Sequence, residues 1–142
     1  PLARGRVTVE VDGEQVSKPY LDITVRMMRD FGATVAHEQF QRFVVEPGGY
    51  RSPGRYLVEG DASSASYFLA AGAIRGSGMV VRGIGRDSVQ GDVRFVEVLE
   101  AMGARVQQDA ASITVAPPAD GRLRAVDVDL NDIPDAAMTL AV

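Results

Sequence analysis

The sequence contains no cysteine, no tryptophan and only one histidine among its 142 residues. Without cysteine, the chain cannot form disulfide bonds, thiolate metal sites or a cysteine nucleophile. The single histidine, His37, excludes a metal site built from several imidazoles, and its polar neighbours predict that it is exposed to solvent. No apolar run approaches the roughly 20 residues that a helix needs to span a bilayer. We therefore expect no metal and no membrane-spanning segment, and the cytoplasm is the default compartment.

The sequence also lacks a concentration of charge of one sign. It carries 15 basic and 19 acidic residues, and the basic residues are scattered along the chain. Neither a basic stripe that binds nucleic acid nor a polybasic patch that binds a membrane surface is present. The composition, 46% hydrophobic, is typical of a globular protein that is long enough to bury a core. We expect no nucleic-acid partner.

Hydrophobic periodicity and turn residues predict alternating strands and helices. Strands are indicated by alternation of β-branched and polar residues, and helices by apolar residues three and four positions apart between a capping residue and a glycine. Helices are expected at 19–31, 62–74, from 87 or 88 to 102, and from 134, and strands at 7–11, 34–45, 56–58, 80–82, 105–106, 112–115 and 126–130. This order gives a mixed α/β fold class.

The predicted helix 62–74 has no polar stripe, so we expect it to be buried on most sides. Asp61 is expected to cap this helix. Three serines near its start, Ser63, Ser64 and Ser66, are interpreted as packing and capping residues.

Two segments of the chain repeat 71 positions apart. Residues 31–35 (Phe-Gly-Ala-Thr-Val) match residues 102–106 (Met-Gly-Ala-Arg-Val), and the same offset places Asp61 on Asp132. Both copies run in the order helix, Gly-Ala, strands, proline-containing loop, strand and acid-capped helix. Similarity at a fixed period predicts a protein assembled from repeated α/β units.

An aspartate, Asp135, lies directly after Pro134 and before a run of small and apolar residues. Proline suits the first helical position, and Asn131 or Asp132 is expected to cap the turn. A carboxylate in this place either stabilises the positive first turn of a helix or performs chemistry there. The helix has completed barely two turns at Val142, and the chain begins at Pro1, so we expect a piece of a longer protein.

Residues 17–20 (Ser-Lys-Pro-Tyr) form a second candidate site. A hydroxyl, free N–H groups at a helix start, a lysine and a phenol make an anchor for a phosphate or a sugar-like hydroxyl. The alternative is a helix capped by Ser17, with a solvated Lys18 and a half-buried Tyr20. The Gly-x-Gly at 83–85 lacks the third glycine of a dinucleotide-binding loop.

Four motifs in order resemble the 5-enolpyruvylshikimate-3-phosphate synthase family: residues 17–20, 57–68 (Leu-Val-Glu-Gly-Asp-Ala-Ser-Ser-Ala-Ser-Tyr-Phe), 83–86 (Gly-Ile-Gly-Arg) and 133–138 (Ile-Pro-Asp-Ala-Ala-Met). The resemblance implies transfer of the enolpyruvyl group of phosphoenolpyruvate to the 5-hydroxyl of shikimate 3-phosphate, without a metal or organic cofactor. It also implies a two-domain fold of repeated βαβαββ-type units, only partly present here. Residues 1–58 would end the first, substrate-binding domain and 59–142 would begin the second, with the crossing near 57–61.

The resemblance assigns three site residues. It implies that Ser17 binds the 3-phosphate, that Tyr20 lines the shikimate site, and that Asp135 contacts the shikimate hydroxyls and accepts a proton. Lys18 is not assigned to phosphoenolpyruvate. The other charged groups of the family's site would lie outside these 142 residues, so we expect the chain alone to be inactive.

Two alternatives to this function stay open. One is a UDP-N-acetylglucosamine enolpyruvyl transferase, which shares fold and donor but relies on other motifs. The other is a non-catalytic fragment that self-associates through exposed apolar faces. The resemblance implies a monomeric parent enzyme.

Overall fold

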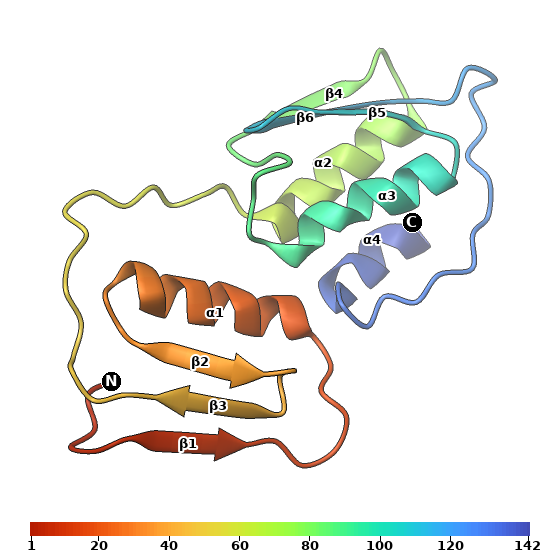
Figure 1. Cartoon of the computed structure of the whole chain (residues 1–142). Coiled ribbons are helices and arrows are strands. Elements are labelled where there is room, and N and C mark those ends of the chain that lie inside the picture. The colour runs from red at the N-terminus through yellow and green to blue at the C-terminus, as the bar shows by residue number, and fades with distance from the viewer. The chain divides into compact units, whose positions relative to one another are not determined.

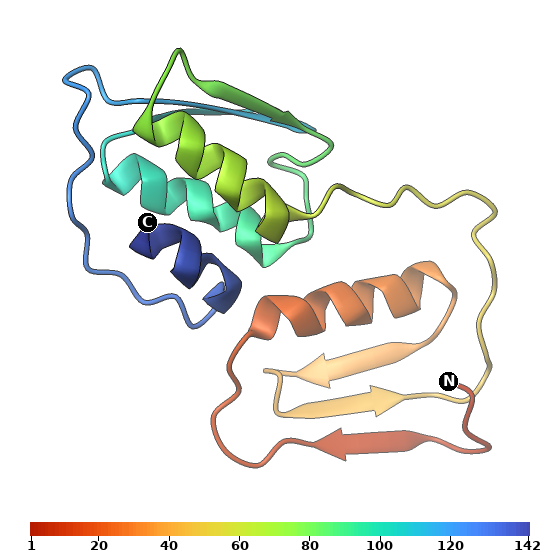
Figure 2. The same cartoon turned by 180° about the vertical axis from the view of Figure 1, so that it is seen from behind.

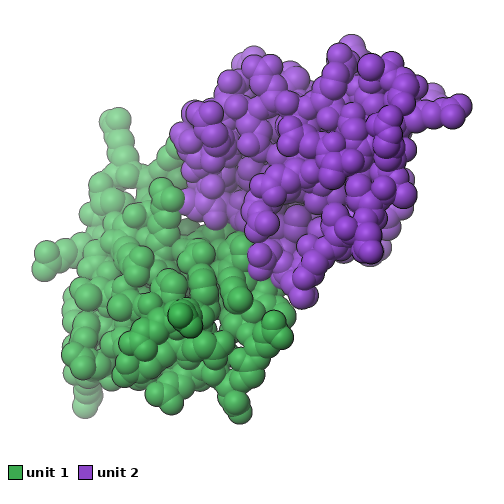
Figure 3. Space-filling view, turned by 45° about the vertical axis from the view of Figure 1, so that its right-hand side comes forward, with its two compact units in different colours: residues 1–58 green, residues 59–142 purple.

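The computed structural model describes all residues from 1 to 142, and the chain divides into two compact units, residues 1–58 and 59–142 (Figure 3). Each unit has its own cluster of buried apolar side chains. None of the helices combines the length and the apolar character that crossing a membrane would require.

The first unit is a three-stranded antiparallel sheet with one helix (Figure 1). The register places Val7 and Val35 opposite Val45, so these three side chains share one face. Helix α1 covers this face on the side of β2, where Val25 and Val35 are buried. The elements are β1 (Val7–Glu10), α1 (Lys18–Asp30), β2 (Val35–Glu38) and β3 (Arg42–Val45), in the sheet order β1-β3-β2.

Residues 35–45 form a hairpin, so the prediction of a single strand over 34–45 was wrong. The chain reverses at Gln39 and Phe40, whose φ angles of 47° and 61° lie in the left-handed region that side chains disfavour. The ring of Phe40 lies 4.6 Å from that of His37, centroid to centroid. His37 is therefore half-buried against aromatic rings, and the expectation that it is solvent-exposed was also wrong.

The second unit has a sheet, two helices on one face of it, and a further short helix beyond them (Figures 1 and 2). Its three strands are antiparallel in the order β4-β6-β5. The elements are α2 (Ala62–Ile74), β4 (Met79–Arg82), the 3₁₀ turn η1 (Gly91–Arg94), α3 (Phe95–Ala101), β5 (Arg105–Gln108), β6 (Ser112–Ala116), the 3₁₀ turn η2 (Pro134–Ala136) and α4 (Ala137–Ala141).

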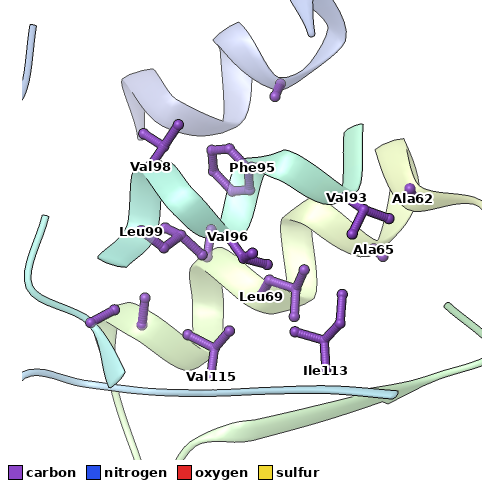
Figure 4. Close-up of a cluster of buried hydrophobic side chains, with 14 of the residues drawn as sticks. Ala62, Ala65, Leu69, Val93, Phe95, Val96, Val98, Leu99, Ile113 and Val115 are labelled. Carbon is purple, nitrogen blue, oxygen red and sulfur yellow. The ribbon is translucent and has the colours of Figure 1, made fainter. Parts of the chain in front are cut away.

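The core of the second unit lies between its sheet and its helices. Figure 4 shows Leu69 of α2, Val96 of α3 and Ile113 of β6 converging there, and none of them exceeds 2% exposure. Gly72 lets α2 approach the sheet, because a Cβ atom added there would lie 2.6 Å from Cβ of Met79. Burial of α2 is confirmed on these inner sides, whereas the rings of Tyr67 and Phe68 are exposed.

The predicted repeat is confirmed in part: the helix, the Gly-Ala pair and the two strands recur, whereas the later strand of each copy does not form and Asp132 does not cap a helix as Asp61 does. Each unit contains the order strand, helix, strand, strand and places the last of these strands in the middle of its sheet; in the second unit α2 precedes this order and α4 follows it. The helices also end alike: the Ala33 N–H donates to the Met28 carbonyl and the Ala104 N–H to the Leu99 carbonyl, each at 2.9 Å. The glycine before each alanine, Gly32 or Gly103, has positive φ, which is the C-terminal cap that glycine favours.

Three other predicted elements differ from the structure. Residues 56–58 and 126–130 are not strands, and the helix expected from 87 or 88 begins only at Gly91, as a 3₁₀ turn. Alternation at 126–130 has a different cause, because Val126 and Leu130 pack against the core as unpaired extended chain. Apolar periodicity reports which side chains are buried, but it does not supply a neighbouring strand.

Residues at the start of the second unit are fixed by one glutamine. The Gln90 amide donates to the Gly60 carbonyl at 2.6 Å and accepts from the Ala62 N–H at 2.9 Å. It also donates to the Glu59 carboxylate at 3.1 Å, which accepts a further hydrogen bond from the Ser88 hydroxyl. We call these residues the Gln90 network.

Asp61 caps α2, as predicted, and the capping group is a carboxylate that can be protonated at low pH. Its carboxylate accepts from the Ser63 and Ser64 N–H groups at 3.2 and 3.3 Å and from the Ser64 hydroxyl. The hydroxyl bond lowers the pKa of Asp61 below its ordinary value of 3.8; burial opposes this effect, and the two N–H bonds add to it. A lowered pKa stabilises the folded unit above the unfolded-state pKa, and that stabilisation is lost as pH falls through the folded-state pKa.

We expect Asp61→Asn to remove this part of the acid sensitivity while keeping the cap, since asparagine caps as well as aspartate. The free energy of unfolding of the wild type should fall more steeply than that of the variant between about pH 5 and pH 2. The difference is expected to stay below about 1 kcal/mol because the carboxylate is largely exposed. Urea unfolding across this range measures it, and parallel curves for the two proteins would contradict the assignment.

Candidate functional site

The three residues assigned from the sequence lie in both units. Ser17 and Tyr20 begin α1 in the first unit, where the Tyr20 N–H donates to the Ser17 carbonyl at 3.1 Å. Asp135 lies in η2 of the second unit. The structure therefore brings Ser17 and Tyr20 together at one helix start and places the carboxylate in a separate body.

Ser17 has an unusual backbone for a serine. Its φ and ψ of 55° and 38° are left-handed, and its hydroxyl forms no capping hydrogen bond with α1. The expectation that Ser17 caps α1 through its side chain was thus wrong. A left-handed residue other than glycine costs about 1–3 kcal/mol, and such strain concentrates at ligand sites. The half-buried hydroxyl of Ser17 makes no capping hydrogen bond with α1, so it is available to bind a ligand.

The residues next to Ser17 agree with the alternative interpretation of the sequence, in which Lys18 is solvated and Tyr20 is half-buried. Lys18 is exposed, and Tyr20 is partly buried. Pro19 occupies the first turn of α1, where its missing N–H leaves no bond unmade. The arrangement offers a hydroxyl, a phenol and an exposed cation around one helix start, which are groups that bind phosphate and hydroxyl oxygens.

Asp135 occupies the first turn of the segment formed by η2 and α4. Pro134 begins this turn as predicted, but the residue before it is Ile133, which provides no side-chain cap. The prediction that Asn131 or Asp132 caps the turn was wrong. The Asp132 carboxylate instead accepts from Arg94 at 3.3 Å, so its role differs from that of Asp61 in the repeat. Asp135 itself is exposed.

The inner side of the same segment is buried. Ile133 and Ala136 are 5% and 0% exposed and pack in the core of the second unit. Thr139, 6% exposed, lies with its hydroxyl oxygen 3.0 Å from the hydroxyl oxygen of Ser66 on α2. Sequence reasoning identified Ser66 as a packing residue but missed this pair. Its signal was the presence of two hydroxyls on otherwise apolar inner faces.

The Gly-x-Gly at 83–85 has a structural role. The Gly83 carbonyl accepts from the Gly60 N–H at 2.9 Å. Gly85 lies against the β5–β6 turn, where an added Cβ atom would be 2.7 Å from the Ala110 carbonyl oxygen. Close backbone approach thus explains Gly85, and the positive φ of 91° explains Gly83, without a nucleotide. No group of three or more His, Cys, Asp or Glu side chains capable of holding a metal occurs in the chain.

Comparison with known proteins extends over the whole chain. The model of the family described as EPSP synthase (3-phosphoshikimate 1-carboxyvinyltransferase) matches residues 1–142. The protein named 3-phosphoshikimate 1-carboxyvinyltransferase is 58% identical in Laribacter hongkongensis, over 100% of this chain and 33% of the relative. The protein of the same name in Cronobacter sakazakii is 56% identical, and the match covers 99% of this chain and 32% of the relative. The chain thus spans about a third of the length of these curated relatives.

Solved structures show the same similarity. EPSP synthase from Acinetobacter baumannii superposes with a TM-score of 0.68 at 25% identity, over 96% of this chain and 31% of that one. An enolpyruvyl transferase from Streptomyces tendae superposes with a TM-score of 0.68 at 21% identity, over 99% of this chain and 34% of that one. This chain therefore shares the fold of that protein. With the family match and the relatives above, these findings establish that the chain belongs to the EPSP synthase family.

Proposed function

We propose that the full-length protein carrying these residues transfers the enolpyruvyl group of phosphoenolpyruvate to the 5-hydroxyl of shikimate 3-phosphate. The family match over residues 1–142 is the observation that carries the proposal. It is supported by relatives above 55% identity that are named for this transferase. In this proposal the two units are the end of the first domain and the beginning of the second.

Ser17 and Tyr20 bind shikimate 3-phosphate in the proposed enzyme. The Ser17 hydroxyl, which α1 does not use, donates to the 3-phosphate, and Tyr20 lines the shikimate ring. A hydrogen bond from a hydroxyl to a charged oxygen contributes about 1.5–3 kcal/mol. The left-handed backbone of Ser17 supports this assignment because strain of this kind concentrates where ligands bind.

Asp135 is the proposed proton acceptor. As the 5-hydroxyl oxygen bonds to the substituted carbon of phosphoenolpyruvate, its proton passes to the carboxylate, and the CH₂ carbon takes a proton from an acid in the remaining chain, which breaks the carbon–carbon π bond. One proton of the resulting CH₃ group then returns to that acid, the double bond re-forms, and the carbon–oxygen bond to the phosphate breaks. Asp135 gives its proton to the departing inorganic phosphate. A carboxylate is a weak base for an alcohol, so it needs a site that aligns it and excludes water. Asp135 is exposed in this chain, and the proposal requires the remaining chain and the substrates to complete that site.

We expect Ser17→Ala in the full-length protein to raise the KM for shikimate 3-phosphate about tenfold or more, with a smaller effect on kcat. Steady-state release of inorganic phosphate measures both constants. Ser17→Gly is the matched control, because it removes the hydroxyl but accepts the left-handed backbone without strain. Both variants should lose affinity equally. Normal affinity in Ser17→Gly would show that the backbone, and not the hydroxyl, is what matters.

The 142-residue chain alone is expected to release no phosphate from the two substrates, because two phosphorylated ligands require several cations to neutralise them. Turnover of UDP-N-acetylglucosamine instead of shikimate 3-phosphate by the full-length protein would favour the first alternative. Concentration-dependent oligomers of this chain that bind neither substrate would favour the self-associating fragment.

A further inference from the structure

Ser66 and Thr139 form a directed hydrogen bond between α2 and α4. The Ser66 hydroxyl lies 2.7 Å from the carbonyl of Ser63, which can only accept, so the single hydroxyl proton of Ser66 is donated there. The 3.0 Å contact with Thr139 must then use the Thr139 proton, with Ser66 as the acceptor. Both side chains are buried, so water does not compete for either hydroxyl.

The bond belongs to a polar chain that continues to η1. The Ser63 hydroxyl donates to the Asp92 carboxylate at 3.0 Å, and Asp92 is 4% exposed. Thr139 is thus connected through Ser66 and the Ser63 backbone to a buried carboxylate on another element. Such networks fix geometry because hydrogen bonds weaken steeply when their angles and distances change.

The segment that carries Asp135 needs external support. η2 and α4 together cover residues 134–141, and helices this short are marginal on their own. Ile133 and Ala136 are buried and contribute apolar packing, which has no directional preference. Thr139 is also buried, and its hydrogen bond with Ser66 is directional. Asp135 precedes Thr139 by four positions, about one helical turn.

We propose that Ser66 and Thr139 are positioning residues that fix the rotation and the axial position of this helix, and through it the carboxylate of Asp135. The inference rests on the proposed function, in which Asp135 accepts the substrate proton. Apolar packing alone lets a two-turn helix slide or rotate, whereas the Thr139–Ser66 bond selects one placement. A misplacement of about 1 Å at a reacting group can cost up to about 100-fold in rate.

Steady-state kinetics of the full-length protein test the inference. Thr139→Val keeps the β-branched shape but removes the hydroxyl, and kcat is expected to fall about tenfold, with KM for both substrates changed by less than about threefold. Thr139→Ser restores the hydroxyl and should keep kcat within about threefold of the wild type. Ser66→Ala should behave like Thr139→Val. The double variant should be no slower than either single variant, because both remove the same bond.

Stability serves as the second readout. The urea midpoint of each variant, measured at the assay temperature, separates displacement of Asp135 from loss of folded protein. If Thr139→Val is unfolded under these conditions, Ser66→Ala and Thr139→Ser decide the question. Wild-type kcat in folded Thr139→Val or Ser66→Ala overturns the inference, as do additive effects in the double variant.

Asp135→Asn distinguishes this inference from the proposed function. An inactive Asp135→Asn together with fully active Thr139→Val overturns only the positioning role. A fully active Asp135→Asn overturns the assignment of Asp135 and removes the basis of the positioning role with it. If kcat falls in Asp135→Asn and in Thr139→Val, while KM is normal in Thr139→Val and kcat is restored in Thr139→Ser, the results support the proposed function and the positioning role.

Discussion

Asp135→Asn is expected to lower kcat of the full-length protein by about 10²–10⁴-fold, the usual contribution of a positioned general base. Asparagine has nearly the same shape as aspartate, so it keeps the fold of η2, but its amide cannot take the proton of the 5-hydroxyl. Release of inorganic phosphate under saturating substrates measures the loss. KM for shikimate 3-phosphate is expected to change less than kcat, since an amide oxygen still accepts hydrogen bonds from hydroxyls.

Asp132→Asn is the matched control, three positions earlier. Asp132 pairs with Arg94 at 3.3 Å on the surface, and exposed pairs of this kind contribute about 1 kcal/mol or less. This variant should keep nearly full activity. Equal losses in both variants would mean that the acidity of the segment matters and not the carboxylate of Asp135 in particular.

Gly85→Ala is expected to destabilise the second unit by about 3 kcal/mol, at the upper end of ordinary overpacking. The added Cβ atom would lie 2.7 Å from both the carbonyl carbon and the carbonyl oxygen of Ala110. Backbone atoms of a hairpin turn cannot move aside as the end of a flexible side chain can, so either the turn or the 83–86 loop must shift. Urea unfolding monitored by circular dichroism measures the change in free energy.

Gly5→Ala provides the comparison, because an added Cβ atom at Gly5 meets nothing within 4 Å. That variant should unfold within about 0.5 kcal/mol of the wild type. If Gly85→Ala lowered the free energy of unfolding as little as Gly5→Ala, the close approach of the 83–86 loop to the β5–β6 turn would be contradicted. The glycines at 83–85 would then again need a functional explanation.

Much of the second unit followed from local sequence. Helix α2 could be predicted at its observed bounds because Asp61 supplies a side-chain cap and a continuous run of small and apolar residues follows. The repeat could be predicted because Gly32 and Gly103 end their helices by the same local hydrogen bonds. Such features depend on residues a few positions apart, so short windows of sequence contain them.

Other features depend on contacts that short windows do not contain. The hairpin at Gln39 and Phe40 lacks the glycine, asparagine or aspartate that usually marks a left-handed turn, and a ring contact with His37 accompanies it instead. The turn before Asp135 carries two capping residues that are not used, since Asp132 pairs with Arg94 on another element. At the candidate site, the residue types could be predicted from the sequence, whereas the left-handed backbone of Ser17 and the Ser66–Thr139 hydrogen bond could not.

The Gln90 network has a consequence for how this protein tolerates insertions and cleavage. It fixes Gly60 and Ala62 by side-chain hydrogen bonds within the second unit, whereas Leu57 and Val58, just before, are 86% and 81% exposed. A protease should therefore cut this stretch at 57–58 and spare 60–62. Extra residues inserted at 57–58 would leave the network intact, and lengthening a flexible connection costs little free energy. The length of this connection is thus a property that evolution or an engineer can change independently of the fold of either unit.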